Sequence, residues 1–259
     1  MKDVIQMTNI LLSGANGRMG KAVARVCEET GNVNITAGYD INTAQYAGFP
    51  VYSSLDEVKE PFDVIIDFSH PALFDSIISC CTEHKKPAVI CTTGLSEAQT
   101  ARLKAAAQTA PIFFSANMSI GINLLIDLCC KAAKLLENNF DIEIIEKHHN
   151  RKLDAPSGTA LAIADAISDA VSYNPEYIYD RHSVRKKRDK SEIGIHAVRG
   201  GTIVGEHEVI FAGNDEVISL KHSAASREVF AVGAVKAAAF MKNRPAGLYN
   251  MQDLIAAAN

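Results

Sequence analysis

Short apolar runs alternate with segments of helical periodicity over the first 117 residues of the chain. The apolar runs cover residues 9–13, 33–39, 62–68, 88–91 and 111–115, and the helical segments cover 19–29, 72–84 and a stretch that opens at Ser96. Strands that alternate with helices are typical of βαβ units, whose strands lie parallel in one sheet. The pattern therefore predicts an N-terminal Rossmann-like parallel sheet in an α/β fold.

The pattern changes after residue 117. Helical periodicity covers residues 120–138 and 159–171, and alternating apolar and polar positions predict strands at 140–146, 193–198, 203–211 and 216–222. Strict alternation favours strands with one covered face, as in antiparallel sheets. We therefore predict a second α+β domain built on a mostly antiparallel sheet. A last helix begins near Ser226, and its alanine-rich face is suited to packing back on the first domain.

Composition and charge narrow the class of protein. At about 150 residues per domain, 259 residues predict two domains. With 47% apolar and 22% charged residues the chain has material for a core, and its net charge of −4 offers no general attraction to nucleic acid. The basic stretch 185–188 has no interleaved aromatic residues, so we interpret it as a solvated loop. We expect no nucleic-acid partner.

Further features bear on location. No apolar stretch approaches the ~20 residues that a membrane span needs, and the N-terminal residues are polar. The six cysteines have no CxxC spacing, which favours reduced, buried thiols over disulfides or zinc ligands. His196, His207 and His222 lie on three predicted strands, yet sheet histidines are more often hydrogen-bonded than metal-bound. We expect a cytoplasmic protein without membrane contact and without a metal.

A glycine-rich loop joins the first predicted strand to the first helix. It reads Gly14-Ala15-Asn16-Gly17-Arg18-Met19-Gly20, with glycines three residues apart instead of the usual GxGxxG. Glycines let the backbone approach a pyrophosphate, and a helix N-terminus presents N–H groups to it. Asp40 ends the second strand, where a carboxylate accepts hydrogen bonds from ribose hydroxyls. The context predicts a dinucleotide site made by Gly14, Asn16, Gly17, Arg18, Met19, Gly20 and Asp40.

Two other loops follow strands of the same predicted sheet. Open parallel sheets bind ligands at the carboxyl ends of their strands, so these loops are candidates for holding the nicotinamide. Their residues are Thr92, Thr93, Gly94, Ser115, Asn117 and Met118. Because Asp40 would repel a 2′-phosphate and residues 41–44 contain no cation, we expect NADH to be used at least as well as NADPH. Arg18 and Lys21 could offset Asp40, so use of both cofactors stays open.

The densest polar cluster is residues 146–159, Glu-Lys-His-His-Asn-Arg-Lys-Leu-Asp-Ala-Pro-Ser-Gly-Thr. Imidazoles can donate a proton near neutral pH, and Arg151 and Lys152 supply positive charge. The Ser157-Gly158-Thr159 turn enters a helix and presents backbone N–H groups to an anion. From these residues alone, a substrate site and a surface loop with Ser157 as a helix cap are equally open.

Taken together, these segments resemble the 4-hydroxy-tetrahydrodipicolinate reductases, or dihydrodipicolinate reductases, of lysine and diaminopimelate synthesis. The resemblance runs through Gly-Ala-Asn-Gly-Arg-Met-Gly, Thr-Thr-Gly and above all the His-His to Ser-Gly-Thr segment. It implies reduction of a cyclic imine dicarboxylate with NADH or NADPH. It also implies that His148 and Lys152 donate protons, and that the substrate is bound by His149, Ser157, Gly158 and Thr159.

The resemblance further implies how the domains are arranged along the chain. Residues 1–117 and 228–259 would form the dinucleotide-binding domain, and residues 118–227 a substrate-binding domain that also builds a homotetramer. Met118 departs from the Phe common in the family, which affects only the nicotinamide packing. Two rival functions share the glycine loop: another small-acid or amino-acid dehydrogenase, and a non-catalytic dinucleotide sensor. Neither needs the full His-His to Ser-Gly-Thr cluster.

Overall fold

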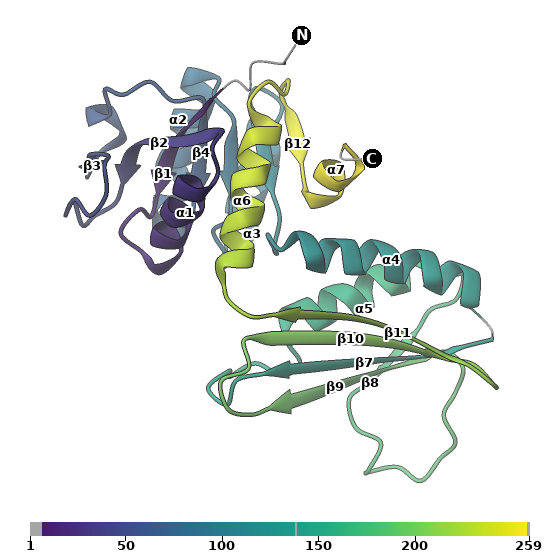
Figure 1. Cartoon of the computed structure of the whole chain (residues 1–259). Helices are drawn as coiled ribbons and strands as arrows, with labels where there is room; N and C mark the ends of the chain where they lie inside the picture. The colour runs from purple at the N-terminus through teal and green to yellow at the C-terminus, as the bar shows by residue number, and fades with distance from the viewer. Residues whose placement is uncertain (1–6, 138, 258–259) are drawn as a thin grey trace. The chain divides into compact units, whose positions relative to one another are not determined.

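The computed structural model describes residues 7–137 and 139–257, which divide into two compact units (Figure 1). Unit 1 contains the chain up to Ile120 together with the chain from Arg227 onward, and unit 2 is Gly121–Ser226. Among the described residues, no helix combines the length and the apolar character that crossing a membrane requires. The six cysteines are free thiols, and burial raises the pKa of Cys27, Cys81 and Cys129 to about 12.

Unit 1 contains a seven-stranded sheet in which all paired strands are parallel. The order across the sheet is β12-β6-β5-β4-β1-β2-β3. The strands are β1 (Thr8–Ser13), β2 (Val33–Tyr39), β3 (Val51–Tyr52), β4 (Val64–Asp67), β5 (Ala88–Ile90), β6 (Pro111–Phe114) and β12 (Gly247–Tyr249). The predicted Rossmann-like parallel sheet is confirmed. Its two edge strands, β3 and β12, were not predicted.

Alternate side chains of these strands enter two cores on opposite faces of the sheet. Ile10 and Leu12 of β1 point to one face and Leu11 to the other, and all three are fully buried. The first face is covered by α1 (Arg18–Glu29), α6 (Glu228–Met241) and α7 (Met251–Ala256), and the second by α2 (Phe74–His84) and α3 (Glu97–Ala106). Short 3-10 turns, η1 (Leu55–Glu57) and η2 (Pro71–Leu73), lie in the connections.

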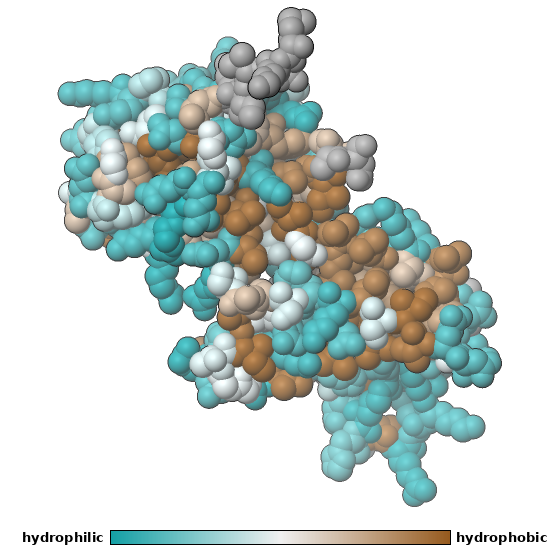
Figure 2. Space-filling model, viewed as in Figure 1, coloured by the Kyte–Doolittle hydropathy of each residue, from teal (hydrophilic) through white to brown (hydrophobic). Residues whose placement is uncertain are grey.

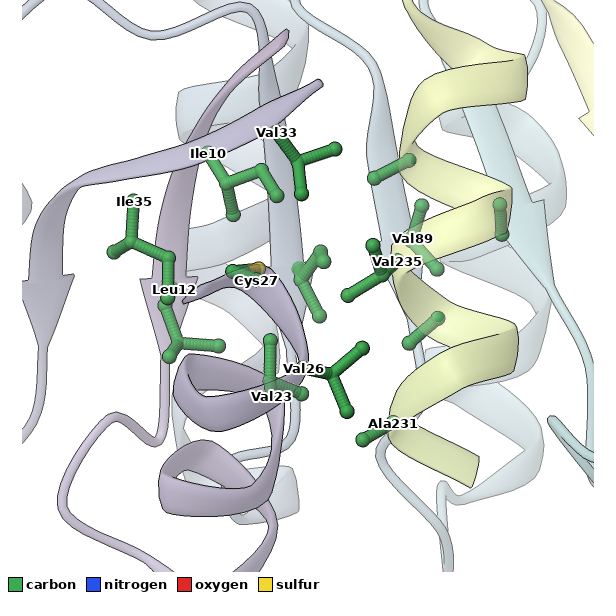
Figure 3. Packing of buried hydrophobic residues seen from close by; sticks show 14 of the residues in the cluster. Ile10, Leu12, Val23, Val26, Cys27, Val33, Ile35, Val89, Ala231 and Val235 are labelled. Carbon is green, nitrogen blue, oxygen red and sulfur yellow. The ribbon is translucent and has the colours of Figure 1, made fainter. Parts of the chain in front are cut away.

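Small side chains allow α6 to pack closely on this unit. Val23 and Val26 of α1 lie opposite Ala231 and Val235 of α6 above the sheet (Figure 3). A Cβ atom at Gly233 would lie 1.7 Å from the carbonyl oxygen of Met118, so only glycine fits at this approach. The predicted packing of the alanine-rich helix on the N-terminal sheet is confirmed.

Unit 2 is an α+β structure on a five-stranded mixed sheet with the order β11-β10-β7-β9-β8. β10 is antiparallel to both β7 and β11, whereas β9 is parallel to β7 and β8. β9 lies parallel to β7 because the chain returns from β7 through α5, as in a βαβ crossover. Its elements are α4 (Ile120–Leu136), β7 (Asp141–His148), α5 (Gly158–Ala170), β8 (Glu176–Ile178), β9 (Glu192–Arg199), β10 (Gly205–Ala212) and β11 (Val217–Ala224). The predicted α+β class is confirmed.

The core of unit 2 lies between this sheet and helices α4 and α5. Ile142 and Ile144 of β7, with Val209 and Phe211 of β10, pack against apolar residues of both helices. Alternation then places Glu146 on the same face of β7 as the two isoleucines. The covered face of the sheet therefore changes from apolar to polar at the end of β7, where α5 begins.

Candidate active site

Two glycines, Gly14 in the loop between β1 and α1 and Gly20 in the first turn of α1, are required by close backbone packing. Gly14 has a φ of +75°, and a Cβ atom there would lie 2.7 Å from the carbonyl oxygen of Phe68. At Gly20 a Cβ atom would lie 2.2 Å from the carbonyl oxygen of Gly14. Gly17 is exposed at the N-cap of α1, which has neither a side-chain cap nor an acidic residue in its first turn. The helix start is therefore open to an anionic group, as a bound pyrophosphate requires.

Asp40 lies directly after β2 and is tied to the glycine loop. Its carboxylate accepts hydrogen bonds from the backbone N–H groups of Asn16, at 2.9 Å, and Asn42, at 3.0 Å. The Asn16 side chain in turn donates to the carbonyl oxygen of Ala44 at 3.0 Å. Each carboxylate oxygen has a second lone pair, so Asp40 retains acceptor capacity for ribose hydroxyls.

A cleft of ≈ 760 Å³ lies at the carboxyl edge of the unit 1 sheet. β1 lies between β2 and β4, and the order of the strands proceeds from β1 in opposite directions on its two sides. Open α/β sheets bind ligands at the carboxyl ends of the strands at such a switch point. The structure thus brings together three of the predicted groups, the glycine loop, Asp40 and the Thr93-Gly94 loop. Residues from these groups that line the cleft are Gly14, Gly17, Asp40, Thr93 and Gly94.

Other residues predicted for the cofactor lie outside this cleft lining. Met118 is buried in the core of unit 1, and the Ser115 hydroxyl donates to the carbonyl oxygen of Asn117 at 2.9 Å. Thr92 is buried and its hydroxyl donates to Asp67 at 2.6 Å. Arg18 is exposed in the first turn of α1.

Asp67 was not predicted from the sequence. It is fully buried at the end of β4, and its carboxylate also accepts the N–H of Ser69 at 3.1 Å. The side chain therefore joins the loop after β4 to the loop after β5 beneath the cleft. The sequence feature that could have identified Asp67 is its place as an acidic residue at the end of an apolar strand.

In unit 2, Glu146 is the centre of a buried polar network. It is 0% exposed and forms two hydrogen bonds with the Arg199 guanidinium, of 2.6 and 2.7 Å. It also accepts the N–H of Ser157 at 2.9 Å and lies 2.6 Å from Nδ1 of His148. Burial alone would raise the pKa of Glu146, but the hydrogen bonds from Arg199, His148 and Ser157 hold it below its ordinary value.

Ser157 connects this network to the start of α5. Its hydroxyl oxygen accepts the N–H of Ala160 at 3.2 Å and lies 3.1 Å from Nε2 of His207. Burial, together with the nearby His148, lowers the pKa of His207 to about 4, so this imidazole is neutral near pH 7. The backbone N–H and the hydroxyl of Ser157 both have partners inside the protein. Gly158, the next residue of the predicted anion turn, is exposed.

The remaining predicted residues surround the end of β7. Lys152 forms an ion pair with Asp154 at 2.9 Å, and the Asp154 carbonyl oxygen accepts a hydrogen bond from Arg199 at 2.7 Å. Nδ1 of His149 is buried and has no partner among the described residues. The Lys152 loop is thus joined to the Glu146 network through Arg199.

Two of the three sheet histidines have side-chain partners. Nε2 of His207 lies 3.1 Å from the Ser157 hydroxyl, and Nε2 of His196 lies 2.7 Å from Glu143. His222 lies opposite His207 in the β10–β11 register. Across residues 7–137 and 139–257, no cluster of three or more possible metal-binding side chains occurs. The stretch 185–188 is a loop in which residues 185–187 are exposed. Within it Lys186 forms an ion pair with Glu192, and Arg188 forms ion pairs with Asp141 and Glu143, which the sequence analysis did not anticipate.

Comparison with known proteins gives consistent matches along the chain. Family models described as dihydrodipicolinate reductase match residues 8–118 with the N-terminal model and 121–255 with the C-terminal model. A 4-hydroxy-tetrahydrodipicolinate reductase of Caldanaerobacter subterraneus is 54% identical over 249 residues, covering 96% of this chain and 98% of the relative. Another, from Clostridium tetani, is 50% identical over 253 residues, covering 98% and 99%.

Solved structures share the fold. A dipicolinate-bound dihydrodipicolinate reductase from Paenisporosarcina sp. TG-14 superposes with a TM-score of 0.79 at 24% identity, covering 95% of this chain and 98% of that one. A myo-inositol dehydrogenase from Corynebacterium glutamicum superposes with a TM-score of 0.61 at 17% identity, covering 97% and 93%. The second match shows that related architecture also occurs in enzymes that act on other substrates.

Proposed function

The chain belongs to the dihydrodipicolinate reductase family, and on that premise we propose that it reduces 4-hydroxy-tetrahydrodipicolinate to tetrahydrodipicolinate with NADH or NADPH, in the diaminopimelate route to lysine. The observation that carries the proposal is the grouping of His148, Lys152 and the start of α5 around one polar end of the unit 2 sheet. This grouping combines proton donors with backbone groups suited to an anion. Neither rival function requires it.

We propose that the protein's own residues bind the substrate and donate the proton. Loss of the substrate's 4-hydroxyl group as water gives a conjugated imine. When bound, the dihydronicotinamide would supply a hydride to this imine and become the oxidised nicotinamide. The enamine that remains must gain a proton, and His148 and Lys152 are the donors we propose. His149, Gly158 and Thr159 would bind the dicarboxylate, with Ser157 supporting the turn from inside through Glu146 and His207.

We assign dinucleotide binding to unit 1 and substrate binding to unit 2. The glycine loop and Asp40 fit a pyrophosphate and a ribose, because backbone packing excludes side chains at Gly14 and Gly20 and leaves Gly17 exposed. Arg18 and Met19 would contribute from the first turn of α1, and Asn16 from the loop. Thr93 and Gly94 line the same cleft, while Thr92, Ser115, Asn117 and Met118 would act by shaping it.

The cofactor preference follows from Asp40 and its neighbours. We expect kcat/KM with NADH to equal or exceed that with NADPH, because Asp40 would repel a 2′-phosphate. Ile41, also in the cleft lining, is 85% exposed, and Ile41→Arg should shift the ratio toward NADPH. The measurement compares kcat/KM for both cofactors at low and moderate salt. A wild-type preference for NADPH of about tenfold, or ~1.4 kcal/mol, would contradict the role given to Asp40.

An inhibitor can test the anion turn. We expect 2,6-pyridinedicarboxylate, a planar dicarboxylate, to compete with the substrate and to bind more weakly after Thr159→Pro. The proline removes a backbone N–H from the second position of α5, while Thr159→Ala retains that N–H and serves as the matched control. Calorimetry on both folded variants gives the affinities. Equal affinity for the proline variant and wild type would exclude this N–H as a carboxylate ligand.

Activity distinguishes the proposed function from its rivals. The condensation product of pyruvate and aspartate semialdehyde should drive oxidation of NADH or NADPH by the purified protein. An amino-acid dehydrogenase would instead require a 2-oxo acid with ammonium, and a sensor would bind the dinucleotide without turnover. Oxidation only in the presence of a 2-oxo acid and ammonium would overturn the assignment.

We also propose a homotetramer and a cytoplasmic location, both in keeping with the family resemblance. Unit 2 exposes apolar side chains that a partner could cover. Val217 and Ile218 are exposed on the edge strand β11, and hydrophobic residues gather over α4, where Leu124, Leu128 and Leu135 are exposed (Figure 2). Large exposed apolar areas are typical of interaction surfaces. The free cysteines suit a reducing compartment.

A further inference from the structure

We propose that Glu146 is a positioning residue that fixes the ring orientation and the tautomer of His148, with Arg199 as the counter-ion of its carboxylate. The proposal rests on the proposed function in assigning proton donation to His148. Neither Glu146 nor Arg199 was among the site residues predicted from the sequence. The Glu146 side chain is buried beneath the site and acts through His148.

The hydrogen bond between Glu146 and His148 determines which ring nitrogen carries the fixed proton. Nδ1 of His148 lies 2.6 Å from Oε2 of Glu146. The two residues alternate along β7, so both side chains lie on the same face of the strand. An ionised carboxylate only accepts hydrogen bonds, so Nδ1 must be the donor. Proton exchange with a substrate is thereby confined to Nε2.

The surroundings of Nε2 leave it available. It has no hydrogen-bond partner among the residues that the structure describes. A Cβ atom at Gly205, the first residue of β10, would lie only 3.2 Å from Nε2, so a side chain at this position would crowd the ring. The ring of His207 packs edge-on against that of His148, with 5.3 Å between the ring centres. Packing on one side and the Glu146 hydrogen bond on the other hold the imidazole.

Arg199 makes a buried carboxylate tolerable at this position. An unpaired charge at a fully buried site would be strongly unfavourable, and the two-point contact with Arg199 balances it. The titratable or charged groups next to His148 are Glu146 on its own strand, Arg199 paired with it on β9, and His207 on β10. His222 and Lys152 interact with His207, and Lys152 is paired with Asp154.

The same carboxylate also has a structural contact, which the test must separate from positioning. Its Oε1 accepts the N–H of Ser157 and so joins β7 to the start of α5. Loss of that contact should affect substrate binding, and hence KM, whereas loss of the contact with His148 should affect kcat. The two contacts therefore predict different kinetic effects.

Glu146→Gln should lower kcat by roughly 10- to 100-fold, the loss typical when the carboxylate partner of a metal-bound histidine is removed. Nitrogen NMR of histidine-labelled protein, with His148 assigned from a His148→Gln variant, should show loss of the single Nδ1–H tautomer. Glu143→Gln is the matched control, since Glu143 lies on the other face of β7 and contacts His196 and Arg188.

A pair of variants keeps the test valid if the single substitution impairs folding. Glu146→Gln with Arg199→Gln removes both charges together, and thermal unfolding checks the fold of each variant. In a His148→Gln background, Glu146→Gln should cause no further loss of kcat but should still raise KM. Retention of full kcat and of the Nδ1–H tautomer by a folded Glu146→Gln variant would overturn the inference. Inactivity of the wild-type enzyme would instead overturn the proposed function, and the tautomer measurement would still test the positioning role.

Discussion

Alanine at His148 or at Lys152 is expected to lower kcat by ~10²–10⁴-fold while leaving NADH affinity unchanged, because a general acid typically contributes this much to the rate. Both residues belong to unit 2, whereas the proposed dinucleotide site lies in unit 1. His148 is the last residue of β7, two residues beyond the end of the strand predicted at 140–146. In the His148→Ala variant, Glu146 keeps its hydrogen bonds with Arg199 and Ser157, so the fold should persist.

Steady-state kinetics and a fluorescence titration with NADH measure the two quantities. Lys187→Ala is the control for Lys152→Ala, because Lys187 is an exposed lysine of the same unit outside the proposed site. Thermal unfolding establishes that each variant is folded. Turnover within a few fold of wild type in a folded variant would remove that residue from proton transfer.

Gly20→Ala is expected to lower the affinity for NADH by more than tenfold and to destabilise unit 1. The added Cβ atom would lie 2.2 Å from the carbonyl oxygen of Gly14 and 2.5 Å from that of Ala15. Both atoms are backbone, so the loop or the first turn of α1 must move. Overpacking typically costs about 1–3 kcal/mol, which corresponds to a fall in Tm of several degrees for a protein of this size.

Gly31→Ala is the matched control at the other end of the same helix. No atom lies within 4 Å of a Cβ atom built there, so stability and NADH affinity should stay near wild type. Calorimetric melting and NADH titration of both variants make the comparison. Wild-type affinity in Gly20→Ala, with an unchanged melting temperature, would contradict the close packing of the loop and its role in dinucleotide binding.

The main strands of unit 1 could be predicted because buried parallel strands appear as continuous apolar runs. Residues 64–67 and 88–90 are fully buried on both faces of the sheet. The short strands β3, β8 and β12 contain only two or three residues and are defined by pairing with distant segments. The parallel direction of β9 also could not be predicted from the sequence. Alternating apolar and polar positions show that one face of a strand is covered, but they do not show the direction of the strand.

The glycine loop and Asp40 could be predicted because their chemistry is local in sequence. The network around Glu146 depends on contacts between distant residues, since Arg199 is 53 positions away and His207 reaches Ser157 across 50 positions. Ile142, Ile144 and Glu146 are alternate residues of β7, so Glu146 lies on the covered face with the two isoleucines. This position of a carboxylate was the sequence feature that could have identified Glu146. β7 runs on to His148, which pairs with Arg199 of β9, whereas the predicted strand ended at residue 146.

The most direct test of the central claim follows an isotope from cofactor to product. The purified protein is supplied with NADH deuterated at the transferring position of the nicotinamide and with the pyruvate and aspartate semialdehyde condensation product. Mass spectrometry of the reduced ring should show one deuterium in tetrahydrodipicolinate for each NADH oxidised. Absence of NADH oxidation, or a product without deuterium, would contradict the assignment of the chain as a reductase of this substrate.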